Sequence, residues 1–461
     1  MAFIRKIKKG NSVYQALVEN YRDKGKVKQR VLKYLGKEFE GGKAFKKVYP
    51  QKIKVENVKR YADGLVVDKL ATELSLKDII KEYNKELLLL VYSHLIEENL
   101  SLQRIEDWVD TTYLREILQI EVVSSKRLYK ALDYLSRVDF GEIEEVIYQR
   151  LKEKAKFEEG IILDVTDTYL NDKNSFFSDK GRRGKDGKYK KLIQISLAIN
   201  KTWGFPVLHK VYNGNISNIH ILKDMITSLK LRKISKFTVI DRGMTSYENL
   251  FFIESLGVKV IGGLRRNKKL EKIVSGIGRE KIYSFSNRIK LINTSVYALE
   301  YPYLGKRLII VYNPALEVVR RELAYEYKGK RAQDKYLGYS FLYTNSSFPL
   351  EEVVKLYFGR ETVERSFKQM KGVLNLRPIR VWLKEHVIAH IRICYLSYSI
   401  LSLLSYYLKD LNISAVKALK ELKNSYIVNL KTDNGDYCSY RIVLKNVHKK
   451  ILDRLGVVYK I

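Results

Sequence analysis

Residues 160–170 read GIILDVTDTYL, an apolar run that ends in acidic and hydroxyl residues, and they open the stretch that decides the fold. Two further apolar runs follow, KLIQISLAIN at 191–200 and GFPVLHKVYNG at 204–214. Farther along, KFTVIDRGM at 236–244 is again a buried strand ending on an aspartate, with helical patterns before and after it. Three strands followed by a helix, a strand, a helix and a strand predict a mixed α/β sheet.

The charge balance of the chain indicates the class of its partner. The 461 residues include 86 Lys and Arg against 52 Asp and Glu, a formal net charge of +34. A compact protein this basic attracts polyanions, so the composition favours nucleic acid as the partner over a merely solvated lysine-rich surface. An ATP-driven helicase or helper is excluded, because the sequence lacks the GxxxxGK[ST] loop that cradles phosphates.

Cysteine usage and hydropathy predict a cytoplasmic protein. Cys394 and Cys438 form no CxxC pair, which argues against a disulfide framework or a zinc finger and fits a reducing cytosol. The first ten residues, MAFIRKIKKG, lack the apolar core of a signal peptide. The longest uncharged stretch, 393–408, is shorter than the roughly 20 apolar residues that cross a bilayer, so we expect a buried helix and no membrane partner.

The segments around the α/β stretch have different patterns. Before residue 70, two short basic strands flank the turn DKGK at 23–26. The next segment has apolar residues at helical spacing and includes a basic helix that Ser124 or Ser125 would cap, an arrangement suited to DNA ends. The predicted parts are a basic β-rich module at 1–70, a helical DNA-binding region at 71–157, an α/β core domain at 158–390 with a β-rich insertion at 267–348, and a helical region at 391–461.

Two aspartates of the core domain follow apolar strand residues, Asp164 in LDVT and Asp241 in VIDRG. If the two strands are neighbours, the carboxylates converge at the rim of the sheet. Mg²⁺ prefers oxygen ligands and is commonly held by one or two carboxylates plus substrate phosphates. Two such ions about 3.5–4 Å apart activate the attacking oxygen and stabilise the leaving oxygen of a phosphodiester. The alternatives are that these aspartates only cap turns, or that Asp167 replaces Asp164 as the first ligand.

A long helix predicted from residue 350 onward carries further polar groups on one face. In KLYFGRETVERSFKQMKGVL, four polar residues are spaced three, four and seven apart: Tyr357, Arg360, Glu364 and Lys371. At about 3.6 residues per turn they fall within a stripe about 60° wide, beside the apolar stripe of the helix. A simple Arg360–Glu364 ion pair is the alternative, but such a pair would not require Tyr357 and Lys371 on the same line.

The spacing Tyr-x2-Arg-x3-Glu-x6-Lys resembles, at all four positions, the signature of DDE transposases of the insertion-sequence-four group. LDVTDTYL and VIDRGMTSYENL resemble the first and second aspartate motifs of that group. The resemblance extends from about residue 160 to residue 404, and a weaker resemblance covers the first 40 residues. It implies a bacterial or archaeal insertion-sequence transposase that cleaves DNA and transfers strands at the ends of its element.

The resemblance also implies a fold, a site and partners. The implied fold is a ribonuclease-H-like catalytic core with a β-rich insertion, flanked by a basic N-terminal β-hairpin and helical DNA-binding region and by a helical C-terminal region. Two Mg²⁺ ions, for which Mn²⁺ substitutes, would be held by Asp164, Asp241 and Glu364. Phosphates near the scissile bond would be contacted by Tyr357, Arg360 and Lys371. The implied partners are double-stranded DNA, as terminal inverted repeats and target, and a second copy of the chain in a homodimeric synaptic complex at the prokaryotic nucleoid.

Some aromatic and histidine residues fit the family pattern less well. Some relatives stack a flipped base on a tryptophan of the insertion. The three tryptophans of this chain all lie outside the predicted insertion: Trp108, Trp203 and Trp382. Tyr283 could take that place, so the cleavage route through a DNA hairpin stays open. His386 and His390 are spaced i,i+4, but with no third ligand nearby we expect a structural role and no zinc.

Two other functions would use the same residues. A ribonuclease-H-like nuclease that cuts without joining needs the same three carboxylates. A non-catalytic DNA-binding protein derived from a transposase would be expected to have lost one of them, whereas all three positions are filled here.

Overall fold

The computed structural model divides the chain into two compact units, Met1–Lys59 with Tyr426–Ile442 and Arg60–Ser425 with Val443–Ile461. The residues that the structure describes are 2–10, 12–38, 53–97, 100–157, 160–169, 182–183, 189–190, 192–231, 237–326, 334–374, 376, 379–432 and 437–459.

The smaller unit contains two three-stranded sheets. The first is built from β1 (Ala2–Lys9), β2 (Ser12–Asp23) and β3 (Lys26–Lys37). Asp23 pairs with Lys26, and the two residues between them, Lys24 and Gly25, have φ of 48° and 77°. Positive φ at both loop residues is the geometry of a type I′ turn, which suits the twist of a hairpin. The predicted hairpin at DKGK is therefore confirmed.

The second sheet of the smaller unit draws on both ends of the chain. Its order is β17 (Tyr437–Arg441), β16 (Tyr426–Thr432) and β4 (Ile53–Arg60). The region predicted as helical, 391–461, contains α15 (Lys384–Tyr407) from its start, α16 (Ala415–Leu422) and α17 (Asn446–Arg454), and the two strands lie between α16 and α17. The two strands escaped prediction because β16 finds one of its pairing partners, β4, at the opposite end of the sequence.

Helices form the first part of the larger unit. Their bounds are α1 (Ala62–Glu73), α2 (Leu76–Ile79), α3 (Asn84–Ile96), α4 (Ile105–Val109), α5 (Leu114–Leu118), α6 (Ser125–Arg137) and α7 (Phe140–Lys154). The hydroxyl of Ser124 accepts a hydrogen bond from the backbone N–H of Arg127 at 3.4 Å and so caps α6. Of the two serines considered, Ser124 is the cap.

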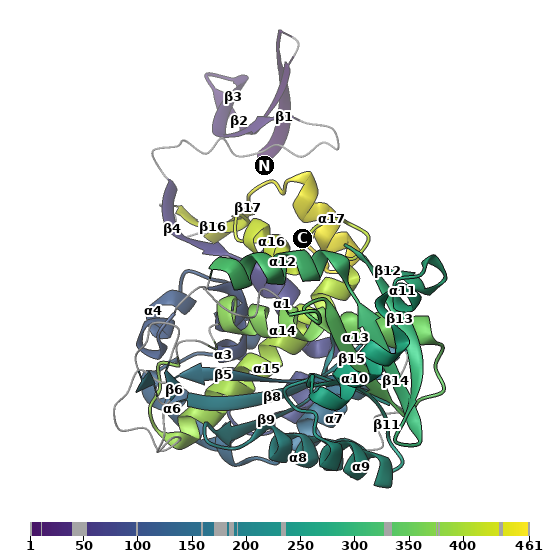
Figure 1. The fold of residues 1–461 in the computed structure, drawn as a ribbon. Coiled ribbons are helices and arrows are strands. Elements are labelled where there is room, and N and C mark those ends of the chain that lie inside the picture. The colour runs from purple at the N-terminus through teal and green to yellow at the C-terminus, as the bar shows by residue number, and fades with distance from the viewer. Residues whose placement is uncertain are drawn as a thin grey trace. The chain divides into compact units, whose positions relative to one another are not determined.

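A nine-stranded mixed sheet forms the centre of the larger unit (Figure 1). The strands of its first part are β5 (Gly160–Tyr169), β8 (Leu192–Asn200), β9 (Pro206–Asn213), β10 (Phe237–Ile240) and β11 (Lys259–Leu264). Their spatial order is β11-β10-β5-β8-β9: β5, β8 and β9 pair antiparallel, whereas β10 pairs parallel with both β5 and β11. The predicted mixed α/β sheet is confirmed. A separate pair of short strands consists of β6 (Arg182–Arg183) and β7 (Tyr189–Lys190).

The segment predicted as a β-rich insertion extends this same sheet. Its strands are β12 (Arg288–Lys290), β13 (Ser295–Tyr303), β14 (Lys306–Tyr312) and β15 (Tyr339–Thr344), and β15 pairs antiparallel with β11. Its helices are α10 (Lys268–Ile277), α11 (Arg279–Ile282) and α12 (Pro314–Glu326). Within residues 281–290 the only strand is β12, because the preceding residues complete α11 and a short 3-10 turn.

The two faces of the sheet are covered by different helices. On β5, alternate residues such as Leu163 share one apolar core with α8 (Asn218–Leu231) and α9 (Tyr247–Ser255), which Figure 1 shows along one side of the strands. The other face of β5 meets the segment after α14, where the Thr168 hydroxyl donates to the Leu376 carbonyl at 3.2 Å. The helices of the remaining chain are α13 (Leu350–Phe358), α14 (Glu361–Gly372), α15 (Lys384–Tyr407), α16 (Ala415–Leu422) and α17 (Asn446–Arg454).

Helix α15 contains the uncharged stretch noted in the sequence. By length and hydropathy it is the one helix, within the described residues, that could cross a membrane, but 83% of the relevant window is buried inside the protein. Its serines hydrogen-bond to backbone carbonyls: Ser397, for example, donates to Val91 of α3 at 3.2 Å. The prediction of a buried core helix is confirmed.

Candidate active site

The parallel pairing of β5 and β10 brings two predicted carboxylates side by side. Leu163 of β5 pairs with Ile240, the last residue of β10. The residues that follow them, Asp164 and Asp241, therefore lie beside each other, since neighbouring strands are about 4.8 Å apart. The sequence placed both residues at strand ends. Asp241 does follow β10 directly, but Asp164 lies in the middle of β5, because pairing with β8 carries β5 on to Tyr169.

The third predicted carboxylate reaches the same place from α14. Glu364 and Asp164 line one open groove, together with Thr166, Phe367, Lys368, Lys371 and Gly372. The pKa of Asp164 is raised to about 6, mainly by burial and also by the negative charges of Asp241 and Glu364, while the Val165 backbone N–H and Arg360 oppose the shift. Three carboxylates that repel one another in this way form an acidic cluster.

Arg360 lies next to this cluster. Its Nη1 is 3.0 Å from Oδ1 of Asp241, although the two groups are not aligned as a hydrogen bond and no other acceptor for Nη1 occurs among the described residues. The guanidinium carbon lies 4.4 Å from the centre of the Tyr357 ring, a cation–π contact. Arg360 therefore neutralises part of the acidic cluster and keeps donor capacity for another oxygen.

Tyr357 is the support under Arg360. Only 5% of its surface is exposed, and burial raises the pKa of its hydroxyl, while Arg360 acts in the opposite direction. A Cβ added to Gly263 of β11 would lie 2.1 Å from the Tyr357 hydroxyl oxygen, so only glycine admits the ring here. The predicted phosphate contact of Tyr357 stays a prediction, and in this structure its ring positions Arg360.

The helix that carries these residues is broken, which corrects the predicted single helix. Helix α13 ends at Phe358 and α14 begins at Glu361, with Gly359 and Arg360 in the turn between them. The calculated stripe of four residues therefore does not lie on one straight helix. The polar residues still meet the sheet, because the turn places Arg360 beside Asp241 and α14 carries Lys371 to the hydroxyl of Thr166.

Asp167, the competing first ligand, lies on the other side of β5. Side chains alternate along a strand, so Asp164, Thr166 and Thr168 share the face of α14, whereas Val165 and Asp167 share the face of α8 and α9. This geometry favours Asp164. The same alternation shows that Thr166, which the sequence reading missed, could have been found from its position two residues after Asp164.

The donors of the acidic cluster suit a hard divalent cation. Every charged ligand is a carboxylate oxygen, and an open groove leaves room for water and substrate phosphates, which Mg²⁺ retains when it binds proteins. The raised pKa of Asp164 also fits, because a bound cation would remove the repulsion that raises it.

A family model described as the transposase DDE domain matches residues 155–400, more than half of the chain. The chain belongs to the DDE transposase family. A second model, described as the N-terminal domain of IS1634 family transposases, matches residues 4–59 of this transposase. The finer assignment to the insertion-sequence-four group stays a prediction.

Comparisons with individual proteins add little to the family assignment. A cryo-EM structure of the piggyBac transposase synaptic complex with hairpin DNA is similar at 12% identity over 78% of this chain and 76% of that chain. Its TM-score of 0.43 is too low to establish a shared fold. No curated protein matches this transposase.

The aromatic residues considered for base stacking lie in different settings. Trp108 is buried and donates to Glu97 at 3.0 Å, whereas Trp203 is half-buried and packs edge-on against Tyr406. Trp382 is 65% exposed. Tyr283 is 47% exposed and packs against two other tyrosines of the β-rich segment. Its role as a base platform stays a prediction.

Proposed function

We propose that this transposase cleaves DNA at the ends of an insertion sequence and joins the freed 3′ ends to target DNA. The observation that carries the proposal is a groove lined by Asp164 of β5 and by Glu364 and Lys371 of α14. Asp241 lies beside Asp164 at the end of β10, and Arg360 lies against Asp241. A carboxylate cluster bordered by cations provides both parts that phosphodiester chemistry needs, ligands for cations and donors for phosphate oxygens.

The strand order supports a ribonuclease-H-like core. Three consecutive antiparallel strands, β5, β8 and β9, are followed by β10 and β11, which add in parallel on the other side of β5. In this order β5 and β10 are adjacent strands, and their pairing brings Asp164 and Asp241 together.

Asp164, Asp241 and Glu364 would hold two Mg²⁺ ions, or Mn²⁺ in their place. When bound, such ions polarise the scissile phosphate and lower the pKa of the attacking water or 3′ hydroxyl. The protein's own contribution is to fix the three carboxylates on two strands and one helix, so that the ligands are in place before substrate arrives.

Arg360 and Lys371 would hold the phosphates. Arg360 offers a planar set of N–H donors that can grip two phosphate oxygens, and Tyr357 and Asp241 set its orientation. Lys371 contacts Thr166 on the strand that carries Asp164, so its charge lies beside the first carboxylate. Tyr357 acts through Arg360, as a positioning residue.

The partners follow from charge and chemistry. A net charge of +34 suits long contact with double-stranded DNA, both terminal inverted repeats and target. Joining two element ends requires two active sites, so we propose a homodimer in the synaptic complex. We also propose a cytoplasmic location at the nucleoid.

The test is a cleavage and joining assay on labelled duplexes taken from the DNA that flanks the gene. With Mg²⁺, the full chain should nick the element end and transfer the labelled 3′ end into a second duplex. Nicking without any transfer product would favour the nuclease alternative. No nicking, with normal binding to the same duplex, would favour a non-catalytic DNA-binding protein.

A further inference from the structure

A second cluster of metal-binding side chains lies in the helical part of the larger unit. His94 comes from α3, and His390 and Cys394 come from α15, where a spacing of four residues puts them on one helix face. One ligand atom from each of the three lies within 4.8 Å of the others. The sequence predicted no third ligand near His386 and His390.

His386 does not belong to this cluster. Its Nε2 lies 2.9 Å from Oδ1 of Asp133, and its ring stacks on Tyr129 at 5.4 Å between centroids. His390 instead faces His94, with their ring centroids 5.4 Å apart, and its Nε2 lies 3.7 Å from Sγ of Cys394. The predicted structural role therefore describes His386, whereas His390 meets two other ligands.

The distances are close to those of a tetrahedral zinc site. With Zn–N of about 2.05 Å and Zn–S of about 2.3 Å, two tetrahedral ligand atoms lie about 3.3–3.6 Å apart. The 3.7 Å between Cys394 Sγ and His390 Nε2 needs almost no adjustment. The other ligand atoms lie within 4.8 Å of one another, so they would have to move about an ångström closer, which rotation of the side chains can provide.

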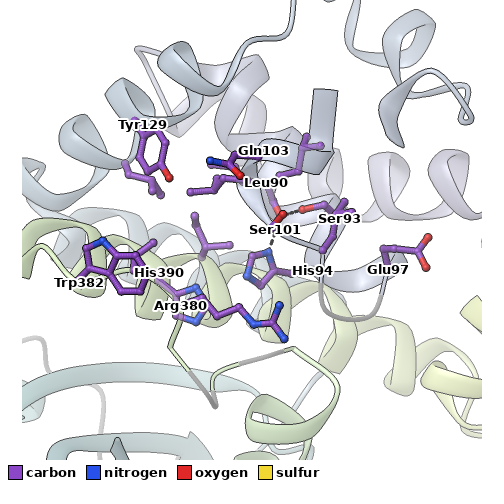
Figure 2. A pocket seen from close by; sticks show the side chains of 16 residues that line it. Leu90, Ser93, His94, Glu97, Ser101, Gln103, Tyr129, Arg380, Trp382 and His390 are labelled. Atoms are coloured by element: carbon purple, nitrogen blue, oxygen red, sulfur yellow. Dashed lines mark hydrogen bonds between the residues drawn. The ribbon is translucent and has the colours of Figure 1, made fainter. Parts of the chain in front are cut away.

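The ring of His94 is already oriented as a ligand. Its Nδ1 lies 2.9 Å from the carbonyl oxygen of Leu90, an acceptor that fixes the proton on Nδ1 and leaves Nε2 with its lone pair (Figure 2). Histidines that bind metals usually make this kind of hydrogen bond with their other nitrogen. Burial lowers the pKa of His94, which favours the neutral form that binds metal.

A pocket of about 260 Å³ gives access to the cluster. Figure 2 shows His94 and His390 on its wall, with the polar side chains of Ser93, Ser101 and Gln103 beside them. This space accepts several water molecules, enough for a fourth ligand. Arg380 also lines the pocket, and a thiolate from Cys394 would offset the charge that a divalent cation adds beside it.

We propose that His94, His390 and Cys394 bind one Zn²⁺ ion, with the fourth coordination position open to this pocket. Two imidazoles and a thiolate select zinc over Mg²⁺, which prefers oxygen. Binding converts the Cys394 thiol to a thiolate and releases one proton to solvent, so the present contact of its Sγ with the Leu374 carbonyl, at 3.2 Å, is given up for the metal bond. The ion would join α3 to α15 directly behind the end of α14.

The test begins with the zinc content of the full chain, expressed without an affinity tag in zinc-supplemented medium and measured by mass spectrometry. We expect about one zinc per chain in the unmodified protein and almost none after His94→Ala or Cys394→Ser. Two matched controls should keep their zinc: His386→Gln, on the same helix, and Cys438→Ser, the other cysteine. An unmodified protein that carries no zinc after incubation with the ion and dialysis would overturn the proposal, whether or not the variants fold.

Cobalt substitution shows which residues hold the ion. The Co²⁺ protein should show a thiolate charge-transfer band that Cys394→Ser lacks. The triple variant Asp164→Asn, Asp241→Asn, Glu364→Gln should keep both its zinc and this band, since the carboxylate cluster is a separate site. A band that persists in Cys394→Ser, or zinc that disappears with the carboxylates, would assign the metal elsewhere and refute the proposal.

Discussion

Asp164 and Glu364 line one open groove, with Asp241 beside Asp164 on the neighbouring strand, whereas His94, His390 and Cys394 gather between two packed helices beside a small pocket. The first set offers hard oxygen donors and space for a substrate. The second offers nitrogen and sulfur donors and a pocket of a few waters. The donor atoms and the space around them therefore distinguish the two sites. The carboxylate groove is suited to exchanging a substrate, and the His94–His390–Cys394 cluster is suited to holding one ion in place.

The largest effect should come from Asp164→Asn, which removes a carboxylate from the groove and leaves the helical cluster intact. We expect cleavage of the labelled end duplex to fall about a thousand-fold, because the loss of a ligand forfeits several kcal/mol of transition-state stabilisation. DNA binding and zinc content should stay the same. Asp167→Asn is the matched control, and equal losses in both variants would break the distinction between the two faces of β5.

Arg360→Ala should have the next largest effect. It removes the donors beside Asp241 but no ligand, so cleavage should fall on the order of a hundred-fold through poorer positioning of the phosphate. Raising the Mg²⁺ or Mn²⁺ concentration in the cleavage assay should not restore the rate. Full rescue by metal would mean that Arg360 only shapes the carboxylate cluster.

Gly263→Ala tests the support under Arg360. The new methyl group meets the Tyr357 hydroxyl, so the ring and the guanidinium above it must shift, and we expect cleavage to fall roughly ten-fold. Gly276→Ala is the matched control, since a Cβ there meets nothing within 4 Å. Unchanged cleavage in Gly263→Ala, with folding verified by circular dichroism, would remove Tyr357 from the account.

The smallest effect concerns stability without metal. The pKa of Asp164 is raised to about 6 by burial and by its acidic neighbours, so the stability that its protonated form contributes at low pH is lost as the pH rises through about 6. In EDTA at neutral pH, Asp164→Asn should therefore raise the Tm, by roughly 2–4 °C for each kcal/mol regained. The gain should vanish near pH 4. A lower Tm of Asp164→Asn at neutral pH would contradict the conclusion that burial and repulsion from Asp241 and Glu364 destabilise the charged Asp164.

The carboxylate cluster could be predicted from the sequence because each of its members lies in a local motif. Asp164 and Asp241 each follow a run of apolar strand residues, and Glu364 has a fixed spacing to Arg360 and Lys371. Two features were not predicted because they depend on pairing between strands that are distant in the sequence. Pairing with β8 extends β5 past Asp164, and pairing of β15 with β11 joins the β-rich segment to the central sheet.

The helical cluster could not be predicted in the same way. His390 and Cys394 are four residues apart, but His94 lies almost 300 residues earlier in the chain and carries no motif. Only the packing of α3 against α15 brings its ring to theirs. The break at Gly359 was hidden because the helical periodicity of the sequence continues across the turn between α13 and α14.

Asp241→Cys tests most directly whether the carboxylates hold the catalytic metal. A thiolate binds Mg²⁺ poorly and softer ions well, so the variant should not cleave the end duplex in Mg²⁺ but should regain cleavage in Mn²⁺ or Cd²⁺. Asp167→Cys, on the opposite face of β5, should cleave in Mg²⁺ like the unmodified protein. Cleavage by Asp241→Cys in Mg²⁺ at the unmodified rate would contradict the proposed role of this cluster.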